Sequence, residues 1–285
     1  MQDQVHIVLD SVSAADETPL KKDPRCHVLR LILRHGDLEW RDGDCPLADM
    51  FKMVDQSGKT PTTSQPPLGE MIELFTRLTD AGKKLIVLNM DSVLSGTYQT
   101  ACAAARQVMD VNKNAAIRVI DSKTAATPIA GIATVVLAAL DAGLDFEGAV
   151  QLTRDLVERT ETFFSINTLD YLYKGGRIGA IGVLVGSILG IRPIARINKD
   201  GQLAVVEKCR TRKKVLKRMV ELAADVGPLE AIYIANAEAP EDAEIIRKGI
   251  CALYPEVPVM LSSIGAVLAA HLGPGAIGIF VTRRA

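Results

Sequence analysis

Hydroxyl side chains are concentrated in one short segment that prolines make rigid. In PTTSQPP, residues 61–67, Thr62, Thr63 and Ser64 are bracketed by three prolines. Proline fixes its own φ angle and favours extended backbone at the residue before it, so these hydroxyl groups have little freedom. The segment is therefore either a plain linker or a rigid edge that presents hydroxyls to a ligand, and its own residues leave both interpretations open.

A second candidate is the turn DSVLSGTYQTA, residues 91–101, between a predicted strand and a predicted helix. Ser95 stands where the N-cap of that helix is expected, and Gly96 supplies one of the first exposed backbone N–H groups. Unpaired N–H groups and the helix dipole make such a terminus suited to an anion. Either Ser95 only caps its helix, or the turn binds an anionic group.

Three further segments combine residue types that binding sites use. YKGGRIG at 173–179 joins two glycines to a lysine and Arg177, HLGPG at 271–275 places His271 before a tight turn, and KCRTRKK at 208–214 begins a basic helix. Each also has a structural interpretation, namely a turn between helices, a structural histidine and a solvated helix start.

The motifs of several enzyme classes are absent. No serine lies in a G-x-S-x-G elbow, no G-x-x-x-x-G-K-[ST] phosphate loop occurs, and no G-x-G-x-x-G follows a predicted strand. The five cysteines never form a C-x-x-C pair, which is against a zinc site or a disulfide framework and favours a reducing cytosol. We expect no metal and no cofactor.

Hydrophobic periodicity indicates an α/β protein. In the first part, apolar runs of strand length alternate with helical segments, as in a parallel sheet covered on both faces. The predicted strands there are 5–10, 27–33, 83–90 and 116–121, and the predicted helices are 47–56, 68–82, 96–110, 132–143 and 146–159.

The pattern changes after about residue 162, where shorter strand candidates appear. They are 163–167, 192–198, 203–209, 231–237, 257–261 and 275–283, with helices from Arg210 and over 241–253. We therefore expect two lobes, an N-terminal α/β lobe over 1–161 and a C-terminal mixed α/β lobe over 162–285.

The composition predicts an ample aliphatic core and no footprint for nucleic acid. Of 285 residues, 48% are hydrophobic and 4% aromatic, and the formal net charge is −1. The N-terminal residues lack the features of a signal peptide, so we expect a cytoplasmic protein. The apolar stretch IGAIGVLVGSILGI at 178–191 is shorter than the about 20 residues of a membrane span. It is either a buried core helix or a wall for an apolar ligand.

Eight segments, in order along nearly the whole chain, together resemble the DegV family. They are DS at 10–11, TSQP at 63–66, LSGTYQTA at 94–101, VIDS at 119–122, TLDYLYKGGRIG at 168–179, IRPIARINKDG at 191–201, RTRKK at 210–214 and HLGPGAIG at 271–278. Each motif is weak by itself, whereas eight in the same order are specific.

The resemblance implies a two-lobed α/β fold with the ligand between the lobes, together one DegV domain over about 4–283, and it implies fatty-acid binding. Several proteins of this family are the acyl-binding subunit of bacterial fatty acid kinase. The partner subunit binds ATP and phosphorylates the carboxylate of a long-chain fatty acid, giving an acyl-phosphate for phospholipid synthesis. The chain itself would then be a lipid-binding protein and not an enzyme.

The resemblance also assigns roles to single residues. It implies that the fatty-acid carboxylate is bound by Thr63, Ser95, Gly96 and His271, with secondary contacts from Thr62, Ser64 and Arg177. The acyl tunnel is expected to be lined by Ile178, Ile181, Leu184, Gly186 and Ile188. Arg210 and Arg212 are expected to contact the kinase.

The chain departs from the family pattern in three places. Pro67 stands where a small serine is usual, Asp91 replaces a serine before LSGT, and KTAATPIAG at 123–131 lacks the usual glycine-rich form. The last two bear on the shape of the acyl pocket. Two alternative functions remain, a stand-alone small-molecule kinase-like enzyme, which the missing nucleotide motifs disfavour, and a lipid carrier without a kinase partner.

Overall fold

The computed structural model describes residues 4–179 and 190–285. The chain divides into two compact units, of which the first comprises Met1–Ile32 and Ser64–Glu158 and the second comprises Leu33–Thr63 and Arg159–Ala285. Residues 33–63 are therefore an excursion of the chain into the second unit.

The first unit is built on a four-stranded parallel sheet in the order β2-β1-β6-β7. β1 is buried throughout and β6 almost throughout, because apolar side chains point to both faces of the sheet. All four strands end at the same sheet edge, so the turns that follow them open there. The strands are β1 (Val5–Asp10), β2 (Cys26–Leu29), β6 (Lys84–Asn89) and β7 (Ile117–Asp121).

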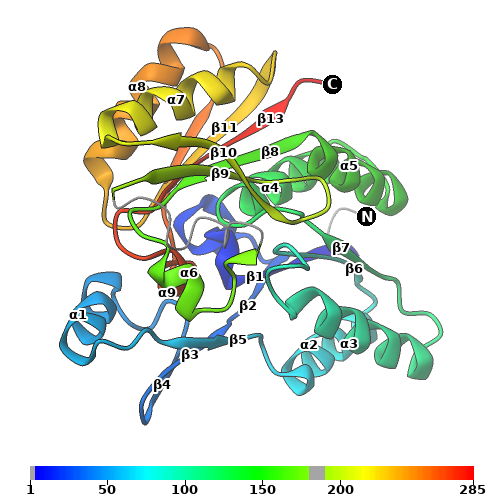
Figure 1. Ribbon diagram of the computed structural model, residues 1–285. Helices are drawn as coiled ribbons and strands as arrows, with labels where there is room; N and C mark the ends of the chain where they lie inside the picture. Colours follow the sequence, from blue (N-terminus) through cyan, green and yellow to red (C-terminus); the bar gives the residue numbers. More distant parts are fainter. Residues whose placement is uncertain (1–3, 180–189) are drawn as a thin grey trace. The chain divides into compact units, whose positions relative to one another are not determined.

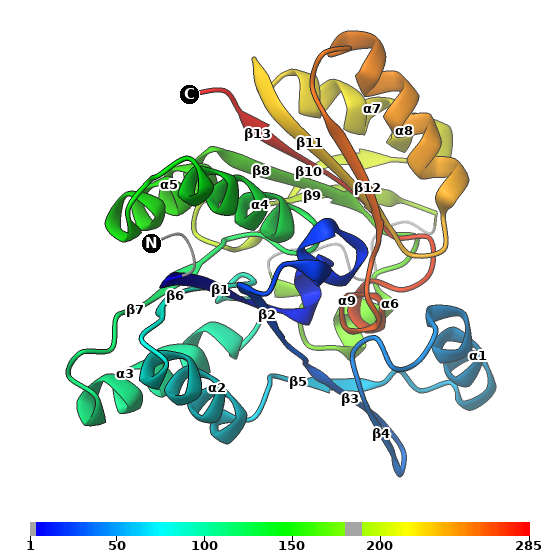
Figure 2. The ribbon, with the colours of Figure 1, turned by 180° about the vertical axis from the view of Figure 1, so that it is seen from behind.

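Helices cover both faces of this parallel sheet (Figures 1 and 2). On one face α2 and α3 lie side by side, and Phe75 of α2 is fully buried against the sheet. α4 lies against β1 and β6, and α5 follows it in the chain. The helices are α2 (Leu68–Asp80), α3 (Thr97–Val111), α4 (Pro128–Asp141) and α5 (Phe146–Arg159), and three 3₁₀ helices, η2 (Ser11–Ser13), η3 (Ala15–Glu17) and η4 (Pro19–Lys22), lie between β1 and β2.

The second unit contains a six-stranded mixed sheet in the order β10-β9-β8-β13-β11-β12. β11 and β12 are parallel, and the other neighbours are antiparallel. α7 and α8 lie side by side over a core that includes Ile232, Ile234 and Ile279 (Figures 1 and 2). The elements are β8 (Thr160–Ser165), β9 (Arg192–Ile197), β10 (Leu203–Cys209), α7 (Arg212–Ala224), β11 (Leu229–Asn236), α8 (Pro240–Leu253), β12 (Val259–Ser263) and β13 (Ile277–Arg283).

A three-stranded sheet in the order β4-β3-β5 and three further helices also belong to the part of the second unit that the structure describes. α9 contacts both α1 and α6, and the rings of Phe51 and Tyr171 meet edge to face with centroids 6.5 Å apart. Segments far apart in the sequence are thus packed together. The elements are β3 (Ile32–His35), β4 (Leu38–Arg41), α1 (Leu47–Ser57), β5 (Thr62–Ser64), α6 (Asp170–Lys174) and α9 (Ala266–Leu272).

The predicted fold class is confirmed, since a parallel sheet and a separate mixed sheet are both present. Three local predictions are wrong. The run 27–33 is two strands, because the chain leaves the parallel sheet after Leu29. The helix after Ser95 has Gly96 and not Ser95 at its N-cap, and the helix predicted from Arg210 begins two residues later, with the Thr211 side chain as its cap.

Candidate functional site

Within the PTTSQPP segment, Thr62–Ser64 form the short strand β5, in line with the extended backbone that its prolines favour. Pro61 and Pro66 flank the strand and are buried. Successive side chains of a strand point to opposite faces, so Thr63 is half-buried while Thr62 and Ser64 are exposed. The hydroxyl that β5 turns toward the protein is therefore that of Thr63.

Thr63 contacts the histidine of the HLGPG segment. Its Oγ1 lies 2.7 Å from Nε2 of His271, although the two residues are 208 positions apart. His271 belongs to the last turn of α9. At the other end of this helix, the backbone N–H of Val267 donates to the buried carboxylate of Asp42 at 3.4 Å. A carboxylate at a helix N-terminus is favourable, so this contact helps to hold α9, and with it His271, in place.

Two glycines close to α9 lie at positions where a side chain would find no room. A Cβ atom at Gly175 would lie 2.2 Å from Nδ1 of His271, although the φ angle of Gly175 is an ordinary −77°. At Gly273, which has φ of 77°, a Cβ atom would come within 2.6 Å of the Tyr171 ring. The glycine at position 175 is thus needed for space and not for backbone freedom.

The surroundings of His271 keep its ring uncharged at neutral pH. Burial lowers the pKa of His271 to about 4, and the positive charge of Arg177 acts in the same direction. Arg177 itself donates to the carbonyl oxygen of Gly175 at 2.8 Å. The neutral ring carries one proton, which resides on either Nδ1 or Nε2.

The contacts of the two ring nitrogens indicate which one is protonated. Nδ1 of His271 is buried and has no hydrogen-bond partner among the described residues. A buried N–H without an acceptor is costly, so we assign the proton to Nε2, from which it is donated to Oγ1 of Thr63. The proton of the Thr63 hydroxyl is then available for a further acceptor.

A buried aspartate organises the turn that carries Ser95. Oδ1 of Asp91 accepts hydrogen bonds from the backbone N–H groups of Val93 at 2.7 Å and Leu94 at 3.2 Å. Burial raises the pKa of Asp91 to about 6, against the effect of these hydrogen bonds. Oγ of Ser95 accepts from the backbone N–H of Thr97 at 3.3 Å. The half-buried Ser95 hydroxyl is therefore held at the positive end of α3.

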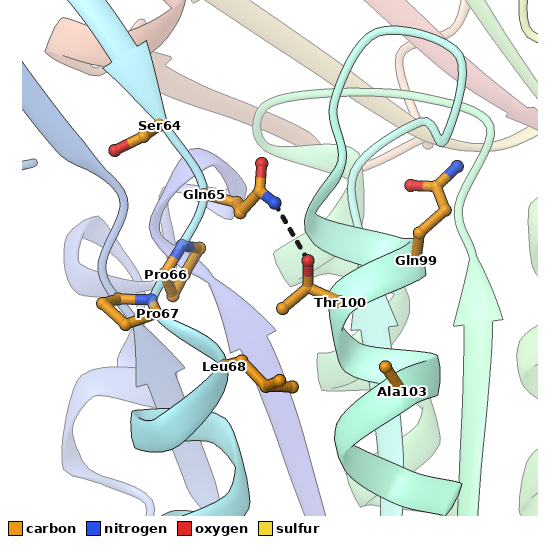
Figure 3. Close-up of a pocket in the computed structure, with 8 residues that line it drawn as sticks. All are labelled: Ser64, Gln65, Pro66, Pro67, Leu68, Gln99, Thr100 and Ala103. Atoms are coloured by element: carbon orange, nitrogen blue, oxygen red, sulfur yellow. Dashed lines mark hydrogen bonds between the residues drawn. The ribbon is translucent and has the colours of Figure 1, made fainter.

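A groove of about 550 Å³ lies along the first turns of α3 in the first unit (Figure 3). The Gln65 side chain reaches across it, and its Nε2 donates to Oγ1 of Thr100 at 3.0 Å. Ser64, a predicted secondary contact, belongs to the wall of this groove and not to the Thr63–His271 contact. The lining residues are Ser64, Gln65, Pro66, Pro67, Leu68, Gln99, Thr100 and Ala103.

The predicted acyl tunnel is described at one residue. Ile178 is half-buried and lies outside any helix or strand. Ile181, Leu184, Gly186 and Ile188 lie outside the described residues. The tunnel therefore stays a prediction.

The two arginines predicted to contact a partner have different surroundings. Arg210 is exposed. The Arg212 guanidinium donates to the Asp242 carboxylate and to the Gly275 carbonyl oxygen, each at 2.7 Å. Arg212 therefore connects α7 to α8 and to the turn after α9, while Arg210 presents its side chain to solvent.

The described residues hold no group of three or more His, Cys, Asp or Glu side chains that could bind a metal ion. All five cysteines are free thiols. Within residues 4–179 and 190–285, the helices lack the length and apolar character that crossing a membrane requires.

Three residues that shape these contacts carry weak sequence signals. Gly175 lies in a segment whose glycines are equally typical of a turn, Gln65 is inconspicuous inside TSQP, and Asp91 is notable only as a departure from the family pattern. The double glycine of YKGG is the one available hint of this contact. Glycine is used in turns and also where another group approaches the backbone closely.

Comparisons with known proteins identify the family. The family model described as "Uncharacterised protein, DegV family COG1307" matches residues 4–284. A DegV domain-containing protein of Listeria innocua is 31% identical over 284 residues, which is 98% of each chain. The chain belongs to the DegV family, as its motifs predict.

Solved structures share the fold. A crystal structure described as a fatty acid binding DegV family protein from Streptococcus agalactiae is 26% identical, with a TM-score of 0.88 over 99% of both chains. The Streptococcus pneumoniae Fatty Acid Kinase (Fak) B3 protein, loaded with linoleic acid, has a TM-score of 0.89 over 99% of this chain and 100% of that chain. Its identity is 19%, so this second likeness establishes the fold alone.

Proposed function

We propose that this protein binds a long-chain fatty acid and presents its carboxylate to a partner kinase. The observation that carries the proposal is the contact of Thr63 with the neutral His271 in a half-buried place. Membership of the DegV family and the likeness to a fatty acid binding relative support this class of ligand.

A carboxylate that leaves water needs several hydrogen-bond donors, because an unpaired buried charge is very costly. In the proposal Thr63 donates its hydroxyl proton, and His271 fixes the direction of that proton. Because His271 is neutral, it orients the Thr63 hydroxyl and supplies no positive charge to the carboxylate. Ser95 and Gly96 are the other proposed donors, since the N-terminus of α3 combines a hydroxyl, backbone N–H groups and the positive end of the helix dipole.

Thr62 and Arg177 are proposed to assist carboxylate binding less directly than Thr63 and Ser95 do. Thr62 donates to the carbonyl oxygen of Arg34 at 3.4 Å, which leaves Thr63 as the hydroxyl of β5 best suited to a ligand. Arg177 carries a permanent positive charge near His271, and this charge favours an anion in the neighbourhood.

The apolar tail supplies most of the affinity in this proposal. At about 0.8 kcal/mol per buried methylene, a tail of roughly 14 methylenes contributes on the order of 11 kcal/mol before the costs of association. Substitutions at the carboxylate are therefore expected to change orientation and turnover strongly and affinity moderately. The stretch 178–191 is the proposed wall of the tunnel.

The proposed reaction takes place on the bound carboxylate. One carboxylate oxygen attacks the γ-phosphorus of ATP, the bond from that phosphorus to the oxygen of the departing ADP breaks, and an acyl-phosphate forms. The kinase subunit supplies the ATP site, in line with the lack of nucleotide motifs in this chain. The exposed Arg210 is the proposed contact with the kinase, and the carrier is proposed to act in the cytoplasm.

Reconstitution tests both halves of this function. The delipidated protein is titrated with palmitate and oleate, and the loaded protein is then mixed with ATP and the purified fatty acid kinase subunit of its source organism. We expect binding, and acyl-phosphate only when both proteins are present. Failure of both fatty acids to bind would overturn the proposal. Binding without acyl-phosphate would overturn the kinase half and favour a carrier that works alone, while acyl-phosphate without the kinase would favour a stand-alone enzyme.

A further inference from the structure

The side chain of Gln65 points from the segment after β5 toward the first turns of α3 (Figure 3). Its Nε2 donates to Oγ1 of Thr100 at 3.0 Å. Its Oε1 faces Gly96, where a Cβ atom would come within 2.8 Å of that oxygen. The backbone N–H of Thr100 donates to the carbonyl oxygen of Gly96 at 3.0 Å, so the amide of Gln65 lies close to both residues that this first helical hydrogen bond joins.

At Gly96 an added side chain would displace the Gln65 amide, and the backbone there does not need the conformational freedom of glycine. The φ and ψ angles of Gly96 are −73° and 1°, a turn conformation with negative φ that is open to residues other than glycine. The volume that a Cβ atom would fill is occupied by the amide of Gln65, with Cδ 3.2 Å away as well. Gly69, at the first turn of α2, is a contrasting case, because a Cβ atom there would meet nothing within 4 Å.

The backbone of Gln65 is restrained by the two prolines that follow it. The residue before a proline is limited to extended conformations, and Pro66 is itself buried. A restrained backbone sets the direction in which the side chain leaves it, and the hydrogen bond to Thr100 then offsets the rotamer freedom that the ordered glutamine loses. Gln65 is thus suited to hold α3 in place.

We propose that Gln65 is a positioning residue that fixes the first turn of α3, and with it the Ser95 hydroxyl and the backbone N–H of Gly96, for the incoming carboxylate. This inference rests on the proposed function. Gln65 contacts no ligand atom in this account, because its amide lies against α3. In this role the lack of a side chain at position 96 lets the amide of Gln65 approach the helix.

A double-mutant cycle separates this role from direct ligand contact. The affinity of the delipidated protein for palmitate is measured for Gly96→Ala, Gln65→Ala and the two together. We expect each single substitution to weaken binding about tenfold, and the double variant to bind as well as Gln65→Ala alone, because the methyl group added at position 96 then meets no amide. Gly69→Ala and Gln107→Ala, an exposed glutamine of α3, are matched controls with unchanged affinity.

An additive cycle would overturn the inference, because the methyl group would then act on the ligand and not on Gln65. Thr100→Val provides a second test, since it removes the hydrogen-bond acceptor and keeps the shape of the side chain. It should weaken palmitate binding in the wild-type background and add nothing to Gln65→Ala, and additivity there would contradict the inference too.

Amide hydrogen exchange without any ligand keeps the inference distinct from the proposed function. The amides of residues 94–100 should exchange several-fold faster in Gln65→Ala than in the wild type, with the rest of α3 unchanged. Equal exchange would overturn the positioning role even if palmitate binds. A further outcome is that the wild type binds no palmitate while exchange is still faster in Gln65→Ala. The contact of Gln65 with α3 would then be upheld, but the proposed function and the ligand-directed role of Gln65 would both fail.

Discussion

Oγ1 of Thr63 and Nε2 of His271 lie 2.7 Å apart, and this contact joins the strand β5 to the helix α9 within one compact unit. In the proposed function the half-buried, neutral His271 acts through its neighbour, because its ring sets the direction in which the Thr63 hydroxyl donates.

Thr63→Ala should weaken fatty-acid binding about ten- to a hundredfold, because it removes one charge-assisted hydrogen bond of roughly 1.5–3 kcal/mol. Thr63→Ser should restore most of the affinity, since it keeps the hydroxyl. Calorimetric titration with palmitate measures the effect, and Thr76→Ala, an exposed threonine of α2, is the control. Equal affinity of Thr63→Ala and the wild type would remove Thr63 from the site.

His271→Ala should keep most of the lipid affinity, because the tail dominates binding, and should lose turnover severely. The expected cause is a Thr63 hydroxyl that no longer has a fixed direction. The measurement is acyl-phosphate formation by the pre-loaded variant with ATP and saturating kinase. Turnover close to that of the wild type would show that His271 is a structural residue only.

Gly175→Ala should act on the site through His271, because the new Cβ atom would lie 2.2 Å from Nδ1. Relief of this overlap requires the ring to move, and overpacking of this kind costs about 1–3 kcal/mol of stability. We expect a lower free energy of unfolding and a loss of turnover similar to that of His271→Ala. Gly69→Ala controls for the added methyl group, and unchanged turnover in Gly175→Ala would contradict the close packing of this ring.

Acid should destabilise the protein in part through His271. Its pKa is lowered to about 4 by burial, below the about 6.5 of an unperturbed histidine. The unfolded chain therefore binds this proton first, and the free energy of unfolding falls as the pH decreases from about 6.5 to 4. His271→Gln should lose less stability than the wild type over this window, by up to about 3 kcal/mol. Urea unfolding at a series of pH values measures the difference.

His27 and Asp91 also have pKa values shifted into this range, so the comparison with the variant is essential. His27 has a pKa lowered to about 4 by burial and by His6, and its effect has the same sign. Asp91, with a pKa raised to about 6 by burial, has the opposite sign, since its stability contribution falls as the pH rises from about 4 to 6. Parallel curves for the wild type and His271→Gln would contradict the lowered pKa of His271.

Arg210→Ala and Arg212→Ala should affect different properties. Arg210 is exposed, so its loss should leave fatty-acid loading intact and slow phosphorylation by the kinase. The Arg212 guanidinium donates hydrogen bonds to Asp242 and to the carbonyl oxygen of Gly275. Its loss should therefore lower the free energy of unfolding by about 1–2 kcal/mol. Loss of fatty-acid loading in Arg210→Ala would contradict its proposed contact with the kinase.

Much of the fold follows from hydrophobic periodicity, because β1, β6 and the helices α2 and α3 are long enough to show their period. The elements that escape prediction are short. β4, α6 and α9 span four, five and seven residues, and they are stabilised by packing with distant segments. The excursion of residues 33–63 into the second unit is likewise set by tertiary contacts.

In the candidate site too, some features follow from local sequence and others depend on contacts between distant residues. Prolines around Thr63 and the helix start after Ser95 are local signals, and both predict the observed backbone within one or two residues. The contact of Gly175 with His271 joins residues 96 positions apart in the printed sequence, and no local pattern encodes it. The roles of Gln65 and Gly175 depend on the absence of a Cβ atom at a particular point in space, which becomes visible in three dimensions.

The most direct test of the central claim is native mass spectrometry of the protein as purified from a bacterial host, followed by release and identification of any bound small molecule. The account predicts one long-chain fatty acid per chain, and markedly lower occupancy in a variant that combines Thr63→Ala with Ser95→Ala at equal thermal stability. A wild-type protein that carries no fatty acid and takes up none from added palmitate or oleate would contradict it.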